Sequence, residues 1–299
     1  MSGLEVDGRA KSRDLYLHLE LLLVVAIWAG TFVATKIVLM EITPALSALY
    51  RYIIASAILI AIDYRNPERI ESKDYPLFIF LSGTGVTLYY LLQHYGIKYT
   101  NATDAAILIS LSPVFIGMIS WFLLGERLRA ITVLGLTLSF SGCILVITDG
   151  NVSANHMDER FWGNILILLT AVSWALYSVY GKRLLRSYSS KTIIKYTTVL
   201  GTIMLIPFSL YEVEATSSFS LSWLGFINLL YLGGLASVYG YLAWYRGLAK
   251  LSAVTVGSYL YFRPLLTGVI AAVILQEHIS ITVIVGGVLI IAGTYLTTQ

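Results

Sequence analysis

The chain has 299 residues, of which 57% are hydrophobic and only 12% are charged, and its mean hydropathy is +0.77. A soluble domain carries about 25% charged residues, so this composition excludes an ordinary soluble protein and indicates one embedded in a lipid bilayer. The net charge of +3 is too small to favour nucleic-acid binding, and Cys143, the one cysteine, excludes an intrachain disulfide.

Apolar runs long enough to cross a membrane follow one another along the whole chain. A transmembrane helix needs about 20 predominantly apolar residues. Runs near this length lie at 17–38, 46–63, 77–97, 102–124, 131–148, 162–181, 193–211, 223–244, 253–275 and 281–298. We therefore expect an all-α integral membrane protein with ten transmembrane helices, a multi-pass protein of the cell membrane.

The sequence also contains an internal repeat. Residues 254–292 align with residues 103–141 at a constant offset of 151, which pairs Pro113 with Pro264 and Glu126 with Glu277. Near the start of each half, an offset of 146 pairs Trp28 with Trp174. The repeat predicts two units, 1–150 and 151–299, each with five helices.

Positively charged residues divide unequally between the two sides that ten spans define. Of the 20 Lys and Arg residues, fifteen fall on the side of the termini; Lys36, Arg51, Lys98 and Arg160 fall on the other side, and Arg263 on neither. Cytoplasmic loops carry the excess of Lys and Arg, so both termini are expected in the cytoplasm. Because each half has an odd number of spans, the second half enters from the opposite face. The sequence thus predicts two inverted five-helix repeats, which suit alternating access.

Three segments resemble a known transporter family. The stretch Ala105–Leu128, "AAILISLSPVFIGMISWFLLGERL", resembles the fourth helix of the drug/metabolite transporter superfamily, EamA-type branch. "RYIIASAIL" at Arg51–Leu59 and "WAGTF" at Trp28–Phe32 resemble its second and first helices. The resemblance implies ten helices in two inverted repeats around a central cavity for small metabolites, often amino acids or drugs moving outward. "LQEHI" at Leu275–Ile279 departs from the expected Leu-Gly-Glu-Arg-Leu ending.

Arg263 is the strongest candidate for substrate binding. It lies about ten residues from either end of the run 253–275, and an arginine at a helix centre costs about 2.5–3.5 kcal/mol even on the mildest insertion scale. Ser252, Thr255, Tyr259 and Thr267 share its helical face. We expect this face to line a wet cavity, where Arg263 binds a carboxylate or phosphate of the substrate. The alternative is that Arg263 caps carbonyl groups of a neighbouring broken helix.

Two prolines are predicted to act as hinges. Pro113 and Pro264 occupy equivalent positions in the middle of predicted helices. Each removes a backbone hydrogen bond and frees the carbonyl four residues earlier, on Ile109 and Leu260. A flexible kink would let one end of each bundle open, whereas a static kink would only shape the packing.

Aromatic residues are numerous and several share a helix face with polar groups. We expect the cavity to be lined by Trp28, Trp174, Tyr177, Tyr89, Gln93 and His94, and the repeat also pairs Tyr90 with Tyr241. Such a site suits an amphiphilic or aromatic substrate, because ligand pockets are mostly apolar with few polar anchors. For each aromatic residue alone, the alternative is a place in the interfacial belt or in packing.

The remaining ionisable residues near the membrane leave the coupling ion open. His94 can titrate near neutral pH and so couple proton movement to transport, or it can be solvated or hydrogen-bonded at a helix end. Glu126 and Glu277 are expected to end their helices and pair with neighbouring bases. The oligomeric state is not predicted.

The sequence favours a secondary transporter that exports a small amphiphilic metabolite, an amino acid or drug-like compound, by alternating access. The alternatives are a sugar-phosphate or nucleotide-sugar exchanger, and a polytopic membrane scaffold without transport. Intramembrane protease motifs and a glycine-rich phosphate loop are absent from the sequence, so neither an enzyme nor a bound cofactor is predicted. With one deep base, Arg263, the sequence favours the metabolite over the sugar phosphate.

Overall fold

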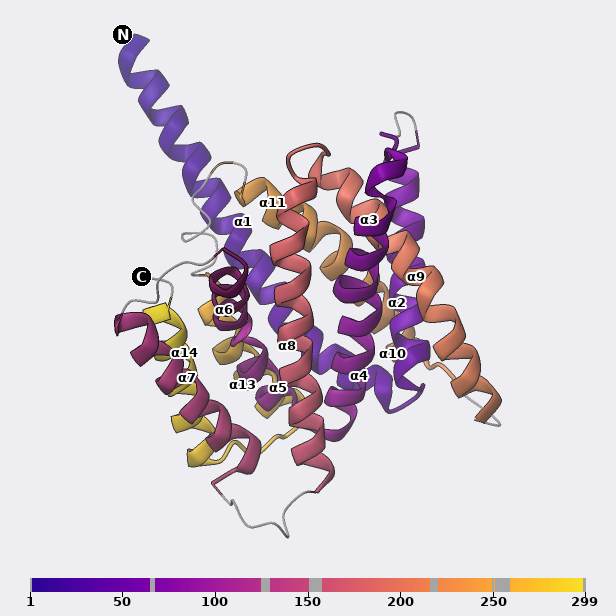
Figure 1. The fold of residues 1–299 in the computed structure, drawn as a ribbon, viewed down its shortest axis with the longest axis vertical. Helices are drawn as coiled ribbons and strands as arrows, with labels where there is room; N and C mark the ends of the chain where they lie inside the picture. Colours follow the sequence, from indigo (N-terminus) through magenta and orange to yellow (C-terminus); the bar gives the residue numbers. More distant parts are fainter. Residues whose placement is uncertain are drawn as a thin grey trace.

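The computed structural model describes residues 2–64, 68–124, 130–150, 158–215, 220–248, 250 and 259–297, and within these residues it contains helices and no strand. The α-helices are α1 (Ser2–Leu39), α2 (Pro44–Ile62), α3 (Tyr75–Ser82), α4 (Tyr89–Tyr99), α5 (Ala102–Ile109), α6 (Ser112–Leu124), α7 (Ala130–Thr148), α8 (Glu159–Leu184), α9 (Ser190–Ala215), α10 (Trp223–Leu230), α11 (Gly240–Leu248), α13 (Phe262–Ile274) and α14 (Ile281–Thr297). Figure 1 shows them gathered into one bundle, with the first helix projecting beyond the others at its N-terminal end.

Eight helical segments of the described chain are long and apolar enough to cross a membrane. They include Ser72–Tyr99, which joins α3 to α4, and Trp223–Gly247, which joins α10 to α11. Two further apolar helices, Tyr259–Ile274 and Ile281–Leu296, are shorter. The fold is that of an all-helical, multi-pass integral membrane protein, as the composition predicts.

The predicted helix over 102–124 is broken rather than continuous. α5 ends at Ile109 and α6 begins at Ser112, so Pro113 lies in the first turn of a new helix, where its missing amide costs little. The carbonyl of Ile109 is free of the helical ladder, as predicted, and the hydroxyl of Ser112 donates to it at 2.6 Å. Ser110 caps the previous turn in the same way, donating to the carbonyl of Ile107 at 2.7 Å. Side chains thus satisfy the broken backbone at membrane depth.

The structure also differs from the predicted helix over 253–275 at the start of that helix. The α-helix α13 begins at Phe262, after a single 3₁₀ turn at Tyr259–Tyr261, and residues 251–258 lie outside the described chain. Arg263 and Pro264 therefore occupy the first turn of α13 rather than the middle of a long helix. A proline without an amide hydrogen fits this first turn better than a helix interior, which is the physical reason for the difference.

Two spans contain a π-helical segment at similar places. The first is Gly83–Leu88, directly before α4, and the second is Tyr231–Tyr239, directly before α11. Each wide turn inserts extra backbone shortly before a tyrosine, Tyr90 in the first span and Tyr241 in the second. These two tyrosines are equivalent in the internal repeat. π-Helical turns inside longer helices are frequent at functional sites, because they shift the register of the side chains that follow.

Helices α7 and α14 pack together through glycines, and they lie side by side in Figure 1. A methyl group added at Gly142 would lie 2.5 Å from the carbonyl oxygen of Gly286, and one at Gly293 would lie 2.5 Å from that of Gly135. Because 142 meets 286 while 135 meets 293, the two helices run antiparallel. Glycines allow this close approach of two backbones, as is common in membranes.

Carboxylates from distant segments cap several helix N-termini. Glu277 accepts hydrogen bonds from the amides of Ala102 (2.7 Å) and Thr103 (3.1 Å) at the start of α5. Glu212 accepts from the amide of Ala45 at 2.8 Å at the start of α2. Glu68 and Glu41 accept from Ser189 and Ser222, the residues before α9 and α10. The first amides of a helix lack intrahelical partners, and a negative charge there is favourable.

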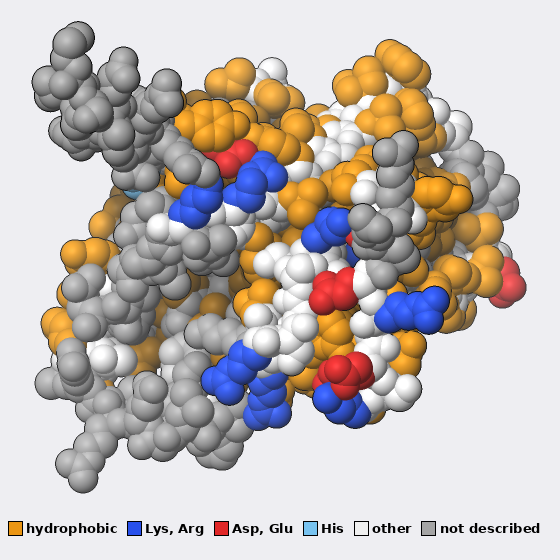
Figure 2. Space-filling model, turned by 90° about the horizontal axis from the view of Figure 1, so that it is seen from above, with side chains coloured by type: hydrophobic (Ala, Val, Ile, Leu, Met, Phe, Trp, Pro, Cys, Tyr) orange, Lys and Arg blue, Asp and Glu red, His pale blue; other side chains and the backbone are white. Residues whose placement is uncertain are grey.

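The face of the bundle that is seen from above carries many of the basic groups. Figure 2 shows Lys and Arg side chains across the middle of this face, with hydrophobic side chains around them. Many of the basic side chains visible in this view thus lie together and not among the hydrophobic side chains at its edge.

Replacing Gly142 with alanine should destabilise the protein, because the new methyl group would meet the backbone of α14 and not a movable side chain. We expect a cost of about 1–3 kcal/mol, the range for overpacking, measured as a lower melting temperature in detergent. Gly117→Ala is the matched control: no atom lies within 4 Å of its added methyl group, so its stability should be unchanged or slightly higher. Equal melting temperatures for both variants would contradict this packing.

Candidate functional site

Arg51 is buried at the centre of the bundle, which corrects its predicted place among the bases of the outer side. It belongs to α2 and only 3% of its surface is exposed. Its Nε donates to the hydroxyl of Ser237 at 2.9 Å, and its terminal nitrogen donates to the hydroxyl of Tyr90 at 3.3 Å. The guanidinium also lies 4.5 Å from the centre of the Tyr90 ring, a cation–π contact. Arg263 is therefore not the sole deep base.

The contacts of Arg51 bring together distant parts of the sequence. Tyr90 belongs to α4, Ser237 to the second π-helical turn, and Tyr241 to α11. The hydroxyls of Tyr90 and Tyr241 lie 3.4 Å apart, so the two tyrosines that the repeat pairs meet each other. The site is thus built from residues of both 1–150 and 151–299.

Arg263 points into the same interior. Its guanidinium carbon lies 5.4 Å from the centre of the Phe32 ring on α1. Tyr89, Tyr90 and Tyr241 are close enough to act on its charge. Its buried Nε has no hydrogen-bond partner among the described residues. A buried donor without a partner costs about 1–3 kcal/mol, so this N–H group is suited to donate a hydrogen bond to a ligand atom.

Aromatic rings connect the surroundings of the two arginines. The centres of the Tyr89 and Trp174 rings lie 5.5 Å apart, and those of Trp174 and Tyr177 lie 5.4 Å apart. Trp28 contacts Tyr241, with ring centres 5.5 Å apart. Four of the predicted residues, Trp28, Tyr89, Trp174 and Tyr177, thus join one aromatic cluster.

The other predicted residues have different surroundings. Gln93 donates to the hydroxyl of Tyr89 at 3.2 Å and so supports the cluster from behind. His94 is fully buried against Tyr90, with ring centres 5.8 Å apart, which corrects the alternative of a solvated histidine. Tyr259 hydrogen-bonds to Nδ1 of His18 at 2.5 Å and makes no ring contact with the cluster among the described residues.

The environment of His94 offers its imidazole few partners. Neither ring nitrogen forms a hydrogen bond of ordinary geometry with the described residues, although the carbonyl of Pro44 lies close by. Tyr90, which contacts the His94 ring, also makes the cation–π contact with Arg51, so the imidazole lies near that guanidinium.

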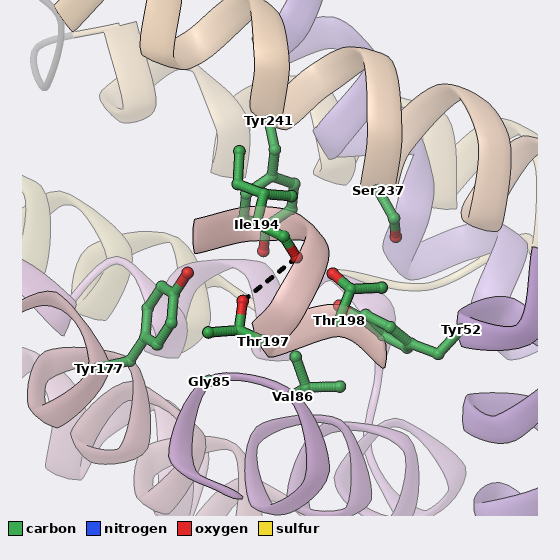
Figure 3. Close-up of a pocket in the computed structure, with 9 residues that line it drawn as sticks. All are labelled: Tyr52, Gly85, Val86, Tyr177, Ile194, Thr197, Thr198, Ser237 and Tyr241. Atoms are coloured by element: carbon green, nitrogen blue, oxygen red, sulfur yellow. Dashed lines mark hydrogen bonds between the residues drawn. The ribbon is translucent and has the colours of Figure 1, made fainter. Parts of the chain in front are cut away.

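A small pocket opens beside Arg51, between the two halves of the chain. Its lining includes Tyr52, Tyr177, Thr197, Ser237 and Tyr241. Figure 3 shows the hydroxyl groups of Tyr177, Thr197 and Tyr241 turned toward the same space. The pocket leaves about 10 Å³ for the centres of water molecules, room for about one water. A metabolite needs more space than this pocket offers.

Ion pairs lie on one face of the bundle, near the end of α2 and the start of α9. Asp63 at the end of α2 pairs with Lys191 at 2.5 Å and also with Lys195, both on α9. Glu20 on α1 accepts from Arg246 on α11 at 2.6 Å. Each pair joins a residue before position 150 to one after it.

The opposite face has ion pairs of its own. Lys36 donates to the carbonyl of Thr100 at 2.5 Å and lies 3.6 Å from the carboxylate of Glu277, whose basic partner is thus distant in the sequence and not a neighbouring base. Arg160 donates to Asp104 at 2.8 Å and to Asp149 at 2.7 Å. Glu126, the predicted counterpart of Glu277, lies outside the described residues, as do Ser252 and Thr255.

Sequence reasoning missed Arg51, Tyr52 and Ser237. One signal for Arg51 was available, because it stands within the apolar run 46–63 rather than in a loop. No comparable signal marks Ser237, since a serine in a membrane helix is common. Its role follows only from the contact with Arg51 at 2.9 Å.

A multi-pass helical bundle with buried arginines and an aromatic cluster at its centre is typical of a membrane transporter. The EamA-like transporter family model matches residues 16–148 and 161–299. The chain belongs to this family, which confirms the resemblance noted in three segments of the sequence.

Relatives of the chain are named as transporters. An uncharacterized transporter of Archaeoglobus fulgidus is 36% identical over 94% of this chain and 96% of its own length. A probable terminal-alkyne amino-acid exporter of Streptantibioticus cattleyicolor is 30% identical over 93% of this chain and 92% of its own. A solved crystal structure superposes with a TM-score of 0.65 at 20% identity, covering 95% of this chain and 97% of that one, and shows the shared fold.

The pairing of Asp63 predicts a pH dependence of stability. Hydrogen bonds from Lys191 and from Lys195 lower the pKa of Asp63, so the folded state favours the ionised carboxylate. This stabilisation is present above the ordinary Asp pKa of about 3.9 and is lost as the pH falls through the lowered value. We expect Asp63→Asn to lower stability at pH 7 by about 1 kcal/mol, since Lys191 is partly exposed.

The measurement is the melting temperature of both proteins between pH 7 and pH 3. The gap between them should narrow as the medium becomes acidic. A gap that stays constant over this range would show that the Asp63 carboxylate is not held ionised by the two lysines.

Proposed function

We propose that this transporter moves a small amphiphilic metabolite out of the cell by alternating access through the centre described above. The observation that carries the proposal is the contact of Arg51 with Ser237 and Tyr90, deep in the bundle and shared by both halves of the chain. A buried charge in a membrane protein usually marks a substrate or ion pathway. Because both halves contribute, a movement of one half against the other changes the site.

The proposal includes ten transmembrane helices in two inverted repeats, 1–150 and 151–299. Three observations support it. Helices α7 and α14, equivalent in the repeat, pack antiparallel through Gly142 and Gly286. The π-helical turns precede equivalent tyrosines, and the two matched stretches of the family model are separated at 149–160. With Arg51 placed in the interior, the charge bias rises to fifteen against three, which favours cytoplasmic termini in the cell membrane.

The substrate class is inferred from the chemistry of the centre. A guanidinium binds a carboxylate through paired hydrogen bonds, and the rings of Trp28, Tyr89 and Trp174 offer an apolar surface for the rest of the molecule. The relative named as a probable amino-acid exporter supports an amino acid or a related compound, moving outward. Among the residues predicted from the sequence, Arg263 is proposed to bind the carboxylate and the aromatic cluster to bind the apolar part of the substrate.

Alternating access requires the two faces to open in turn. On one face Asp63 must separate from Lys191 and Lys195, and on the other Glu277 must separate from Lys36. Pro113 and Pro264 stand at the helix breaks nearest to the centre, where the backbone can bend without losing a further hydrogen bond. We propose these breaks as the hinges.

A sugar-phosphate or nucleotide-sugar exchanger is the second candidate. The specific observation in its favour is Arg51, because it adds a second deep base to Arg263 and phosphate groups attract several bases. Counterflow with a sugar phosphate, compared with counterflow of an amino acid, separates the two candidates.

Replacing either deep arginine should abolish specific transport. We expect Arg51→Ala and Arg263→Ala to lower saturable counterflow in proteoliposomes at least about tenfold, since a charge-assisted hydrogen bond contributes about 1.5–3 kcal/mol. Arg51→Lys and Arg263→Lys should also be impaired, because an ammonium lacks the planar fork. A thermal-shift screen of amino acids, aromatic amines and sugar phosphates selects the labelled substrate.

Arg183→Ala is the matched control, because this exposed arginine lies over Tyr180 near the end of α8 and away from the centre. Its counterflow should equal that of the wild type. Full counterflow in the Arg51 and Arg263 variants, at normal expression, would refute the proposed site.

A further inference from the structure

Most carboxylates in the described part of the chain already have polar partners, and none of these partners is Arg51 or Arg263. Of 17 Asp and Glu residues, eleven have such partners: Glu20, Glu41, Asp63, Glu68, Glu71, Asp74, Asp104, Asp149, Asp158, Glu212 and Glu277. Glu159 and Glu214 are exposed at the ends of α8 and α9. The side chains of Glu5, Asp7, Asp14 and Glu126 lie outside the described part of the structure.

The centre therefore contains two permanent positive charges without a matching negative charge among the described residues. Arg51 is held by the hydroxyls of Ser237 and Tyr90, and the groups that act on Arg263 are Tyr89, Tyr241 and Tyr90. Hydroxyl groups satisfy hydrogen bonds but do not neutralise a guanidinium, which stays protonated in proteins. Two uncompensated cations in a low-dielectric interior create a strongly positive potential.

This potential discriminates between ligands by net charge. A carboxylate gains the attraction of both arginines. An ammonium group meets no described carboxylate, and a cation–π contact of about 0.5–2 kcal/mol with the aromatic rings must compete with repulsion from two guanidiniums. The order of preference should be organic anion, then zwitterion, then cation.

We infer that the substrate carries a net negative charge, as an aromatic or acyl carboxylate, and that its export is driven by the membrane potential without a coupled ion. This inference rests on the proposed function and specifies its substrate. A potential that is negative inside drives an anion outward, by about 2.3 kcal/mol per charge for 100 mV. Among the described residues, the buried carboxylates that could carry a coupling proton already have partners, with Asp104 bound to Arg160 and Glu212 bound to the first amides of α2.

The test uses three ligands that differ in charged groups on one phenyl–carbon frame. They are 3-phenylpropanoate (anion), L-phenylalanine (zwitterion) and phenethylamine (cation). The purified full chain should show the largest rise in melting temperature with the anion and the smallest with the cation. In proteoliposomes, a potassium gradient and valinomycin set the membrane potential. A potential of 100 mV should change the steady-state ratio of anion concentrations across the membrane about 50-fold. Protein-free liposomes serve as the control, because they measure how much of the protonated, uncharged acid crosses the lipid without the transporter.

A variant adds the missing charge. Ser237→Asp places a carboxylate next to Arg51, so it should weaken binding of 3-phenylpropanoate and raise the relative preference for L-phenylalanine. Ser237→Ala removes the same hydroxyl without adding charge and should keep the wild-type order. Unchanged preference in Ser237→Asp would contradict the charge argument, as would anion transport that ignores the potential or needs a proton gradient.

The outcomes separate the inference from the proposed function. If phenethylamine or L-phenylalanine binds best, or if none of the three ligands binds while another compound shows saturable counterflow, the charge selection is wrong and the transporter stands. If no compound of the screen shows counterflow, the proposed function fails and the inference falls with it.

Discussion

Polar groups cannot be left without partners inside a membrane, and the structure meets this constraint by using carboxylates to cap helix starts. Glu277 caps α5, Glu212 caps α2, and Glu68 and Glu41 bind at the starts of α9 and α10. In water these first amides would be hydrated, whereas at the edge of a bilayer an unpaired amide costs several kcal/mol. Each of these four caps comes from a distant segment, so the same bonds that satisfy the backbone also hold the bundle together.

This use of the carboxylates has a consequence for the centre. Negative charge is concentrated near the two faces, and the interior retains Arg51 and Arg263 with tyrosine hydroxyls as neighbours. A structural ion pair would have neutralised Arg51, and a leucine would have avoided its desolvation. The chain has neither, which is difficult to explain by stability and simple to explain if a ligand supplies the negative charge. Packing of α7 on α14 through glycines leaves the centre to the remaining helices.

The sequence predicts the helices, the aromatic cluster and an inward Arg263 because these depend on local hydrophobicity and on the repeat. It fails for Arg51, since the charge-counting rule assigns any arginine near the end of an apolar run to the nearest loop. The sequence also does not predict the helix breaks, because a proline fits both a kinked helix and the first turn of a new helix. At Pro113 the structure has a new helix, and the hydroxyls of Ser110 and Ser112 donate to the backbone carbonyls at the break. The cap from Glu277 to α5 joins residues 175 positions apart, which no local pattern encodes.

The centre is energetically costly for the protein, and this cost bears on transport. The Nε of Arg263 and both ring nitrogens of His94 are buried with no ordinary hydrogen bond from the described residues, and the adjacent pocket has room for about one water. Each such group raises the free energy of this structure by about 1–3 kcal/mol. The ion pairs of Asp63, Glu20, Lys36 and Arg160 at the two faces offset this cost. Because partly exposed pairs contribute about 0–1 kcal/mol each, they offset only part of this cost, and under the proposed function a bound substrate would supply the missing partners.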